Sequence, residues 1–314
     1  MNISTDQKLV SVVLAAYNGG RFLAHQLNTV LAQTYTPIEI IITDDGSTDN
    51  TPDILRQYAA AHPQIKIHFN ETNLGYIRNF EKAIGLASGD YIALCDQDDD
   101  WLPEKIEKLV HAIGDYPMVY CDSLLCNENL EAGGKKISDV ANCLSFSSCL
   151  QQAVFCRVYG HATLIKRSML QRALPFPEVL PHDWWLSFVA TLEGGILFYP
   201  EALVRYRQHS NNIFGAVGGK RRKEDKDLKQ EKQQKELADI RARIHHFYHA
   251  CPEKLVGEKK ALLSLVNAYK DFRLMNDLRR VGIFLRYRKS LLAVKKRSTA
   301  RKILFCLKMF VKIK

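Results

Sequence analysis

The stretch Tyr91–Trp101 reads YIALCDQDDDW, an apolar run that ends in a cluster of carboxylates. Its first five residues have the length and composition of a buried β-strand. Because side chains alternate along extended chain, Asp96 and Asp98 can project to the same side. Carboxylates placed in this way can bind a divalent cation such as Mg²⁺, which usually keeps room for substrate phosphates. The stretch therefore predicts a metal site at a strand end, and the alternative is an acidic loop that caps the helix starting near Pro103.

The residues around this stretch repeat a strand–helix pattern. Nearly continuous apolar runs predict strands, and apolar residues at helical spacing predict the helices between them. The expected strands are 9–16, 38–43, 65–69 and 91–95, and the expected helices are 23–31, 53–61 and 76–87. Strands that alternate with helices favour parallel pairing with right-handed crossovers. The predicted fold class is α/β, with a mostly parallel sheet flanked by helices.

Beyond Trp101 the pattern is less regular. Helices are expected at 103–113 and from Pro181 to about 192, and strands at 118–121 and 196–199. The segment Gly133–Lys136 reads as a loop, and the form of residues 127–158 is not predicted.

Composition divides the chain into two parts. Hydrophobic residues make up 46% of the 314 residues, which is enough for a packed core. Residues 1–217 carry 16 Lys and Arg against 24 Asp and Glu, whereas residues 218–314 carry 28 against 10. We therefore expect a domain at 1–218 that differs in kind from the rest of the chain. A basic helical region follows at 219–314.

The eight cysteines and the polar N-terminus indicate a cytoplasmic protein. No Cys-x-x-Cys occurs, so buried reduced thiols are favoured over a zinc site or disulfides. Residues 1–8 lack the apolar region of a signal peptide, and no uncharged apolar stretch approaches the ~20 residues of a spanning helix.

Polar residues follow each predicted parallel strand. Open α/β sheets bind ligands beyond the carboxyl ends of their strands, where Asn18, Asp45, Asn73 and Arg78 would join the acidic cluster. Neither a Gly-x-Gly-x-x-Gly turn nor a Gly-Lys-Ser/Thr loop is present, so a metal ion rather than a glycine cradle is expected to neutralise bound phosphates. Asp45 and Arg78 would then contact the nucleoside.

Two later stretches carry candidate chemistry. Asp183 lies in the first turn of the helix that begins near Pro181, beside two tryptophans, and burial beside aromatic rings raises the pKa of a carboxylate toward that of a general base. The alternative is a helix-capping aspartate beside core tryptophans. His209 could complete a metal site or contact a diphosphate, although a lone histidine at a strand end can also be incidental.

In this order, the motifs resemble those of the family 2 glycosyltransferases with the GT-A fold. The likeness covers roughly residues 8–214 and rests on five segments in series: Ala16-Tyr17-Asn18-Gly19, Asp44-Asp45-Gly46-Ser47-Thr48-Asp49-Asn50-Thr51, Asn73-x-Gly75-x-x-Arg78-Asn79, Asp96-Gln97-Asp98-Asp99 and His182-Asp183-Trp184-Trp185. The chain looks most like the bacterial rhamnosyltransferase-like branch that builds O-antigens and capsules. It departs from many members at Ala15 and Ala16, where they have Pro and Thr.

The resemblance implies that residues 1–218 form the catalytic domain, with a nucleotide-binding half at about 1–122 and an acceptor half at about 123–218. It also implies a role for each site residue. Asp183 would be the catalytic base of an inverting transfer. Asp96 would contact the ribose or the metal, Asp98 and His209 would bind Mg²⁺ or Mn²⁺, and Asp99, Trp184 and Arg207 would lie near the diphosphate or the acceptor. The nucleotide-sugar site would comprise Ala16, Tyr17, Asn18, Asp45, Asn73, Arg78, Asp96 and Gln97. The expected donor is a dTDP- or UDP-sugar, and the expected acceptor is a glycan or a lipid-linked molecule.

The basic C-terminal part predicts a membrane-surface association. From Leu278 to Lys314 there are 13 Lys and Arg and no acidic residue, interleaved with apolar residues. Basic amphipathic helices of this kind lie on anionic membranes. Nucleic-acid binding is the competing reading, but no DNA- or RNA-binding motif accompanies the charge. We therefore expect a peripheral protein on the inner face of the cell membrane.

Two other functions remain open on the sequence. An α/β nucleotidyltransferase also needs acidic metal ligands, although it usually has a Gly/Lys/Arg-rich phosphate loop near the first strand. A membrane-bound scaffold with a degenerate nucleotide site is the non-enzymatic alternative.

Overall fold

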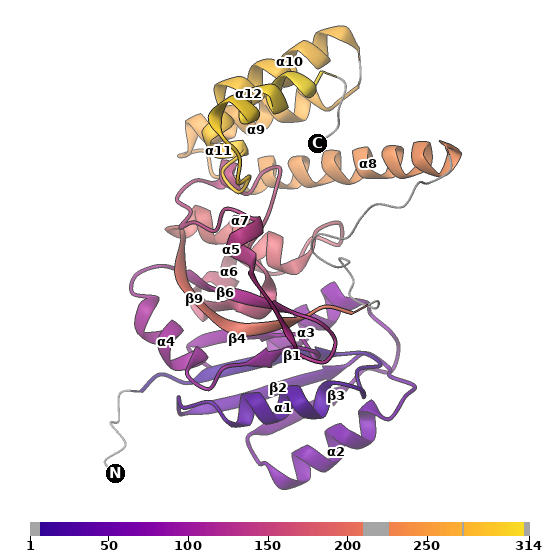
Figure 1. Ribbon diagram of the computed structural model, residues 1–314, viewed down its shortest axis with the longest axis vertical. Helices are drawn as coiled ribbons and strands as arrows, with labels where there is room; N and C mark the ends of the chain where they lie inside the picture. The colour runs from indigo at the N-terminus through magenta and orange to yellow at the C-terminus, as the bar shows by residue number, and fades with distance from the viewer. Residues whose placement is uncertain (1–6, 210–225, 272, 311–314) are drawn as a thin grey trace.

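Four parallel strands form the first half of the sheet in the computed structural model, which describes residues 7–209, 226–271 and 273–310 (Figure 1). Their order is β3-β2-β1-β4. The strands are β1 (Val10–Ala16), β2 (Ile38–Asp44), β3 (Ile65–Phe69) and β4 (Tyr91–Cys95), and the helices between them are α1 (Leu23–Leu31), α2 (Thr51–Ala61) and α3 (Tyr76–Leu86). The prediction for this half is confirmed, including the common edge at which all four strands end.

Beyond β4 the sheet becomes mixed. The additional strands are β5 (Asp100–Trp101), β6 (Met118–Cys126), β7 (Ala132–Lys136), β8 (Thr163–Lys166) and β9 (Ile196–Arg207). Strand β8 pairs antiparallel with both β4 and β6, whereas β6 and β9 are parallel. The sheet is therefore mixed: the predicted parallel pairing holds for the N-terminal strands and recurs between β6 and β9, but the strand–helix alternation on which the prediction rested ends at β4.

The segment Gly133–Lys136 was wrongly predicted to be a loop. It belongs to β7, which pairs antiparallel with β6 at the sheet margin. All five residues of β7 are exposed, so no apolar alternation marked the strand in the sequence. The backbone pairing with β6 holds these residues in an extended strand instead.

Further helices complete the part of the chain up to residue 209. They are α4 (Lys105–Ala112), α5 (Ile137–Val140), η1 (Cys149–Gln151), η2 (Gly160–Ala162), η3 (Arg167–Met169), α6 (Leu170–Ala173) and α7 (His182–Glu193). Helices α4 and α7 agree with the predicted helices to within two residues at each end.

Helices cover both faces of the sheet, and a separate hydrophobic cluster fills each side. Val12 and Leu14 of β1 point into the cluster shared with α1, α2 and α4. Val13 points the opposite way, into the cluster shared with α3 and α7. This alternation follows from the two-residue period of a strand and makes β1 a central, doubly covered strand.

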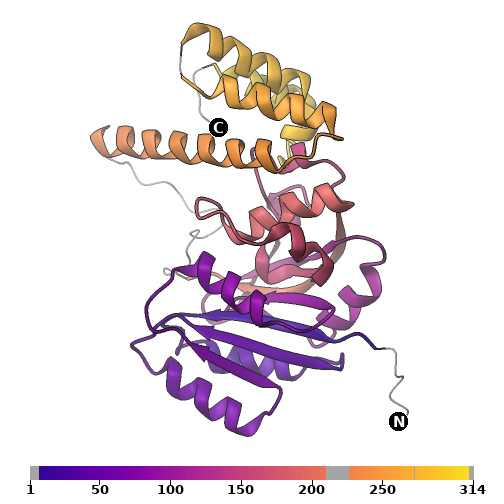
Figure 2. The ribbon, with the colours of Figure 1, turned by 180° about the vertical axis from the view of Figure 1, so that it is seen from behind.

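The C-terminal helices pack on the α7 side of the molecule, at the end opposite α2 (Figures 1 and 2). They are α8 (Lys226–Ala250), α9 (Val256–Ala268), α10 (Leu274–Arg286), α11 (Arg288–Leu291) and α12 (Thr299–Lys308). The rings of Phe188 in α7 and Phe247 in α8 stack with their centroids 3.9 Å apart. The helices thus share one hydrophobic cluster with the sheet domain, while the proposed boundary at residue 218 lies outside the described residues.

Among the described residues, no helix is both long and apolar enough to span a membrane. All eight cysteines are free, as the sequence predicted.

Candidate functional site

The loop after β1 and the loop after β4 are joined by one glutamine. The Tyr17 backbone N–H donates to Gln97 Oε1 over 2.9 Å, and Gln97 Nε2 donates to the Tyr17 carbonyl over 3.1 Å. A Cβ on Gly19 would lie only 2.2 Å from that Gln97 oxygen, so the contact requires a glycine. Four predicted nucleotide-site residues, Ala16, Tyr17, Asn18 and Gln97, therefore meet at the carboxyl ends of β1 and β4.

Asn18 links this corner to the loop after β2. Its backbone is in the left-handed region, with φ of +47°, which Asn tolerates better than most residues. Its N–H donates to Ser47 Oγ over 2.8 Å, and its side-chain oxygen accepts from the Thr48 N–H over 2.8 Å. The loops after β1 and β2 consequently hold each other in place.

Asp45 is buried and bonded to its own chain. One of its carboxylate oxygens accepts from Asn70 Nδ2 and the Leu74 N–H, both over 2.8 Å, and the other accepts from the Gly75 N–H over 2.9 Å. Asn73 donates to the Asp45 carbonyl over 3.0 Å. In this structure Asp45 therefore fixes the loop that starts α3, and a contact with a nucleoside base stays a prediction.

Arg78 lies on the same loop–helix junction but points to acidic partners. It pairs with Glu81 over 2.6 Å and with Glu178 over 2.8 Å, and its side chain is 36% exposed. A nucleobase would have to compete with these two carboxylates, so the role of Arg78 also stays a prediction.

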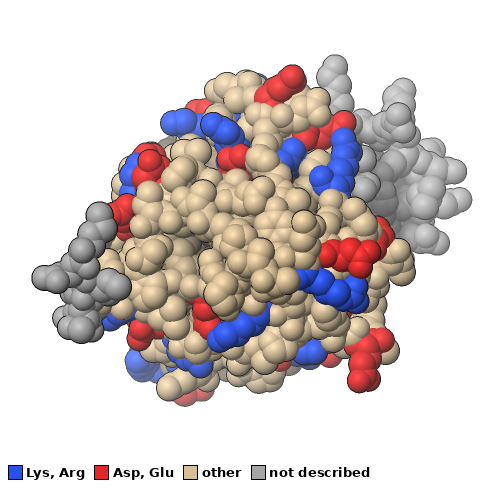
Figure 3. Space-filling model, turned by 90° about the horizontal axis from the view of Figure 1, so that it is seen from below, with Lys and Arg blue, Asp and Glu red and all other residues tan. Residues whose placement is uncertain are grey.

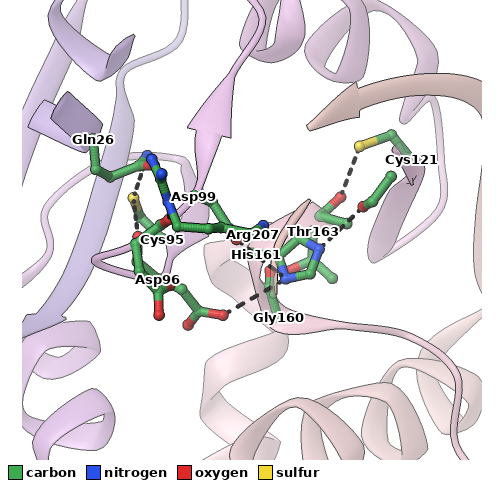
Figure 4. Close-up of polar contacts among 12 residues, drawn as sticks. Gln26, Cys95, Asp96, Asp99, Cys121, Gly160, His161, Thr163 and Arg207 are labelled. Carbon is green, nitrogen blue, oxygen red and sulfur yellow. Dashed lines mark hydrogen bonds and ion pairs between the residues drawn. The ribbon is translucent and has the colours of Figure 1, made fainter. Parts of the chain in front are cut away.

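The acidic cluster after β4 surrounds a histidine (Figure 4). Nδ1 of His161 lies 3.4 Å from Oδ2 of Asp99 and 3.6 Å from Oδ2 of Asp96, while its Nε2 lies 3.0 Å from the Ser123 hydroxyl. Asp99 is fully buried, whereas the Asp96 side chain is 39% exposed. Asp96 is therefore the member of this group that faces solvent.

Burial and like charge act on these carboxyls in different ways. Burial, reinforced by the charges of Asp98 and Asp96, raises the pKa of Asp99 well above its usual value. Partial burial also opposes ionisation of Asp96, but the contact with His161 outweighs it and lowers the pKa of Asp96. Asp99 is therefore driven toward its protonated form, and a bound cation would favour the ionised form instead.

Asp98 pairs with a histidine just beyond the end of β9. Its Oδ2 lies 2.8 Å from Nε2 of His209. Arg207 braces this corner, since its Nε donates to the Asp98 carbonyl over 2.6 Å and its backbone N–H donates to Asp99 Oδ1 over 3.0 Å. The structure thus brings Asp98, Asp99, Arg207 and His209 together, although 108 residues separate Asp99 from Arg207 in the chain.

Asp183 lies on the other side of the same histidine segment. A Cβ on Gly160, the residue before His161, would lie 3.6 Å from the Asp183 Cβ and 3.1 Å from His182 Nε2, so the short residue allows α7 to approach. Burial raises the pKa of Asp183 to about 7, partly opposed by the Trp184 N–H, and the charge of Asp96 adds to the rise. Asp183 and Asp96 consequently influence each other across the site.

The two residues beside Asp183 are anchored in the structure. His182 stacks on Phe80 with the ring centroids 4.0 Å apart, and burial lowers its pKa to about 4, so its ring is neutral. The Trp184 indole N–H donates to the Gln152 carbonyl over 2.6 Å. The carboxylate of Asp183 is therefore carried by a rigid first turn of α7.

Sequence reasoning missed two residues of the site. His161 was overlooked because it lies in a segment without hydrophobic period, although its small neighbours Gly160 and Ala162 were a signal of close packing. Lys105 was read as part of an ordinary amphipathic helix, yet it is fully buried and its Nζ donates to the His161 carbonyl over 2.6 Å. Burial lowers the pKa of Lys105 to about 8.

The donor atoms fit a divalent cation. Asp96, Asp99 and His161 each offer one ligand atom, and these three atoms lie within 4.8 Å of one another. Asp99 Oδ2 is buried and accepts no hydrogen bond, so it has a free lone pair. The two carboxylates suit Mg²⁺ or Mn²⁺, whereas the imidazole is a ligand more typical of transition metals. The predicted set of Asp96, Asp98 and His209 overlaps this group at Asp96.

This arrangement of a mixed sheet with an acidic rim after β4 belongs to a known family. The model of the glycosyl transferase family 2 matches residues 11–172, which is more than half of the chain. The protein is a member of that family.

The chain is also similar in sequence to other bacterial proteins and similar in fold to a solved structure. The chain is 32% identical over 223 residues to an uncharacterized protein of Mycobacterium tuberculosis, and the match covers 68% of this chain and 63% of that relative. It is 40% identical over 210 residues to TuaG of Bacillus subtilis, whose name presents it as a candidate glycosyltransferase of teichuronic acid biosynthesis, with 65% of this chain and 81% of the relative covered. The mannosyltransferase PcManGT of Pyrobaculum calidifontis, solved with GDP-Man and Mn²⁺, has a similar fold: its TM-score is 0.55 at 17% identity, over 96% of this chain and 79% of that one.

Proposed function

We propose that the protein is an inverting, metal-dependent glycosyltransferase that moves a sugar from a nucleotide-sugar donor to a glycan or a lipid-linked acceptor. The observation that carries the proposal is Asp183, whose pKa is raised to about 7 and which lies next to the Gly160–His161 segment bound to the acidic rim. A general base should have a pKa close to the working pH.

The donor would lie at the edge where β1, β2 and β4 end. Residues of the loops after these strands, from Ala16 to Asn18 and from Asp96 to Gln97, line it, and Asn73, Asp45 and Arg78 stand at its far side. We favour a dTDP- or UDP-sugar, because the sequence resemblance suggests these nucleotides. Mannosyltransferase PcManGT was solved with a guanosine donor, so GDP-sugars belong in any screen.

Asp96, Asp98, Asp99, His161 and His209 are the residues that would hold the metal. A bound Mg²⁺ or Mn²⁺ supplies positive charge to the diphosphate as it leaves. Arg207 keeps this loop in position, since it donates to the Asp98 backbone carbonyl and to the Asp99 carboxylate.

Asp183 would take the proton from the acceptor hydroxyl. The oxygen then attacks the anomeric carbon on the face opposite the departing nucleoside diphosphate, which inverts the configuration in one displacement. The neutral His182 and the anchored Trp184 hold the base in one orientation, so little motion is needed during the reaction.

The relatives suggest a role in bacterial surface polysaccharide synthesis, as in O-antigens, capsules or related polymers, because TuaG carries a teichuronic acid biosynthesis name. The C-terminal helices support an inner-membrane location. The apolar side chains Leu274, Met275 and Leu278 of α10 are exposed, as are Leu304 and Leu307 of α12 and Phe310 just beyond it. Exposed basic residues accompany them, whereas the far end of the molecule shows acidic and basic side chains interspersed around an uncharged centre (Figure 3).

The test is a screen of dTDP-, UDP- and GDP-sugars with Mg²⁺ or Mn²⁺, followed by hydrolysis and by thermal shift. We expect one nucleotide class to stabilise the protein and to be hydrolysed slowly, and Asp98→Asn and Asp183→Asn to lose turnover. Release of pyrophosphate from a nucleoside triphosphate and a sugar phosphate would favour a nucleotidyltransferase instead. A scaffold would keep its cellular function in both variants.

A further inference from the structure

Arg243 of α8 is a buried cation on which Asp239 and Glu236 of the same helix act only at longer range. The residue is 6% exposed, and its guanidinium lies over the Trp184 ring, 4.0 Å from the ring centroid. Among the described residues, no carboxylate oxygen forms an ion pair with it within 4.0 Å, and its Nε and Nη2 atoms have no hydrogen-bond partner. Burial lowers the pKa of Arg243 to about 10, which leaves it charged at neutral pH.

An arrangement of this kind is costly for a protein that uses it only for packing. Stacking on an indole attracts the cation, but it leaves the in-plane N–H groups unsatisfied. A buried charge without a partner is strongly unfavourable, and replacement by an apolar side chain of similar volume is often neutral or stabilising. We therefore asked which group could satisfy the guanidinium.

The two unpaired nitrogens lie on the same edge of the guanidinium. Nε and Nη2 form a fork whose parallel N–H groups match two oxygens of one phosphate or carboxylate. A second unsatisfied group lies at the same tryptophan: both amide atoms of the Gln152 side chain are buried without a partner, while the Gln152 carbonyl accepts from the Trp184 indole. An oxyanion could accept from the arginine fork and from the Gln152 amide nitrogen.

The shared contact with Trp184 relates Arg243 and Gln152 to the proposed base. Trp184 directly follows Asp183, the proposed base. Burial and the charge of Asp183 raise the pKa of the Cys156 thiol, and Cys156 is in turn one of the groups that act on Arg243. Asp183, Trp184 and Cys156 are all partly exposed, so solvent reaches the side chains around the tryptophan on which Arg243 stacks.

We propose that Arg243 and Gln152 form a phosphate-binding subsite of the acceptor, on the side of Trp184 that faces α8. This inference rests on the proposed glycosyl transfer and adds that the acceptor carries a phosphate or diphosphate close to the hydroxyl that reacts. It also gives the C-terminal helical region a part in acceptor recognition, because α8 supplies the arginine.

The first experiment measures anion binding by thermal shift on the full chain in EDTA, so that no metal-dependent donor site contributes. Inorganic phosphate and pyrophosphate are titrated against chloride of equal ionic strength. We expect pyrophosphate to stabilise the wild type and Arg243→Met to weaken this response on the order of 10- to 100-fold. Arg241→Met is the matched control: Arg241 lies two residues away on α8 and is exposed, and it should respond like the wild type.

The same variants separate ligand binding from a structural role. Without anion, Arg243→Met should melt at the same temperature as the wild type or higher, because the unpaired charge has been removed. A lower melting temperature together with an unchanged pyrophosphate response would overturn the proposal. So would an equal loss of the response in Arg241→Met.

The second experiment identifies the source of the phosphate. Transfer is measured to a short-chain polyprenyl diphosphate sugar and to the same sugar on a phosphate-free aglycone. Arg243→Met should raise KM at least tenfold for the diphosphate acceptor and little for the other. Equal KM changes for both acceptors would exclude a phosphate subsite. If the wild type hydrolyses no donor at all, the proposed function fails. The anion titration in EDTA does not depend on activity, so it still tests whether the phosphate subsite exists.

Discussion

Nε2 of His209 lies 2.8 Å from Oδ2 of Asp98, although 111 residues separate the two in sequence. The pair joins the end of β9 to the loop after β4, and both side chains are largely buried. A hydrogen bond between a histidine and a carboxylate of this geometry positions the ring, and the same atoms are suited to a shared cation.

The first prediction concerns metal affinity. Asp98→Asn and His209→Ala should each reduce the stabilisation by Mn²⁺, typically by 10- to 100-fold in affinity, because each removes a ligand or its orienting partner. Isothermal titration with Mn²⁺ in the presence of the nucleoside diphosphate is the measurement. His25→Ala is the control, since His25 pairs with Asp100 over 2.7 Å outside the proposed ligand set. Unchanged affinity in His209→Ala but loss in His161→Ala would assign the metal to Asp96, Asp99 and His161.

The second prediction concerns the pH dependence of turnover. Because burial raises the pKa of Asp183 to about 7, the base is ionised above that pH and protonated below it. The rate of transfer should therefore rise with pH through about 7, and Asp183→Asn should lower kcat roughly 10²- to 10⁴-fold. A pH–rate profile at saturating donor measures this, and a profile flat between pH 5 and 9 would contradict it.

The raised pKa of Asp183 also predicts how the stability of the fold changes with pH. Its pKa in the folded protein lies above the unfolded value of about 4, so ionisation destabilises the fold as the pH rises between these values. Asp183→Asn should consequently melt at a higher temperature than the wild type at pH 8, while the difference shrinks at pH 4. Calorimetry at both pH values checks the sign.

Glu39 has a lowered pKa, so its ionised form stabilises the fold, in contrast to that of Asp183. Its buried carboxylate accepts from Ser11, Ser88 and Lys66, and despite the cost of burial these bonds lower its pKa to about 2. The resulting stability is present above the unfolded pKa of about 4.3 and is lost as the pH falls through about 2. Glu39→Gln should cost on the order of 2 kcal/mol at pH 7, measured by urea unfolding. Asp53→Asn, on an 82% exposed side chain, should cost much less.

The next prediction concerns the C-terminal helices. Phe247→Ala should destabilise the whole protein by about 3–5 kcal/mol, because Phe247 is fully buried against Phe188 of α7. Phe310→Ala, at a residue 38% exposed, is the matched control and should cost far less. A separate, early melting transition in Phe247→Ala would show that the helices unfold independently.

The exposed apolar residues of α12 make a prediction for membrane binding. In a vesicle sedimentation assay, the double variant Leu304→Glu, Leu307→Glu should bind anionic lipids more weakly than the wild type. Equal binding would remove the support for a membrane surface.

The N-terminal half of the fold could be predicted from the sequence, because its strands are buried on both faces and therefore appear as continuous apolar runs. The run Tyr91–Cys95 and the carboxylates after it located the site at a strand end without any three-dimensional information. Asp183 was identified for a similar reason, since its tryptophan neighbours are adjacent in the chain.

Only the tertiary structure decided which distant groups meet. His161 approaches Asp96 and Asp99 because β8 pairs antiparallel with β4, and such a pairing leaves no local pattern in either strand. Strand β7 is exposed on every residue, so its order comes from its partner alone. The contact of Arg243 with Trp184 depends on how α8 packs against α7. Sequence periodicity reports what each segment buries, whereas contacts between segments depend on the packing of the whole chain.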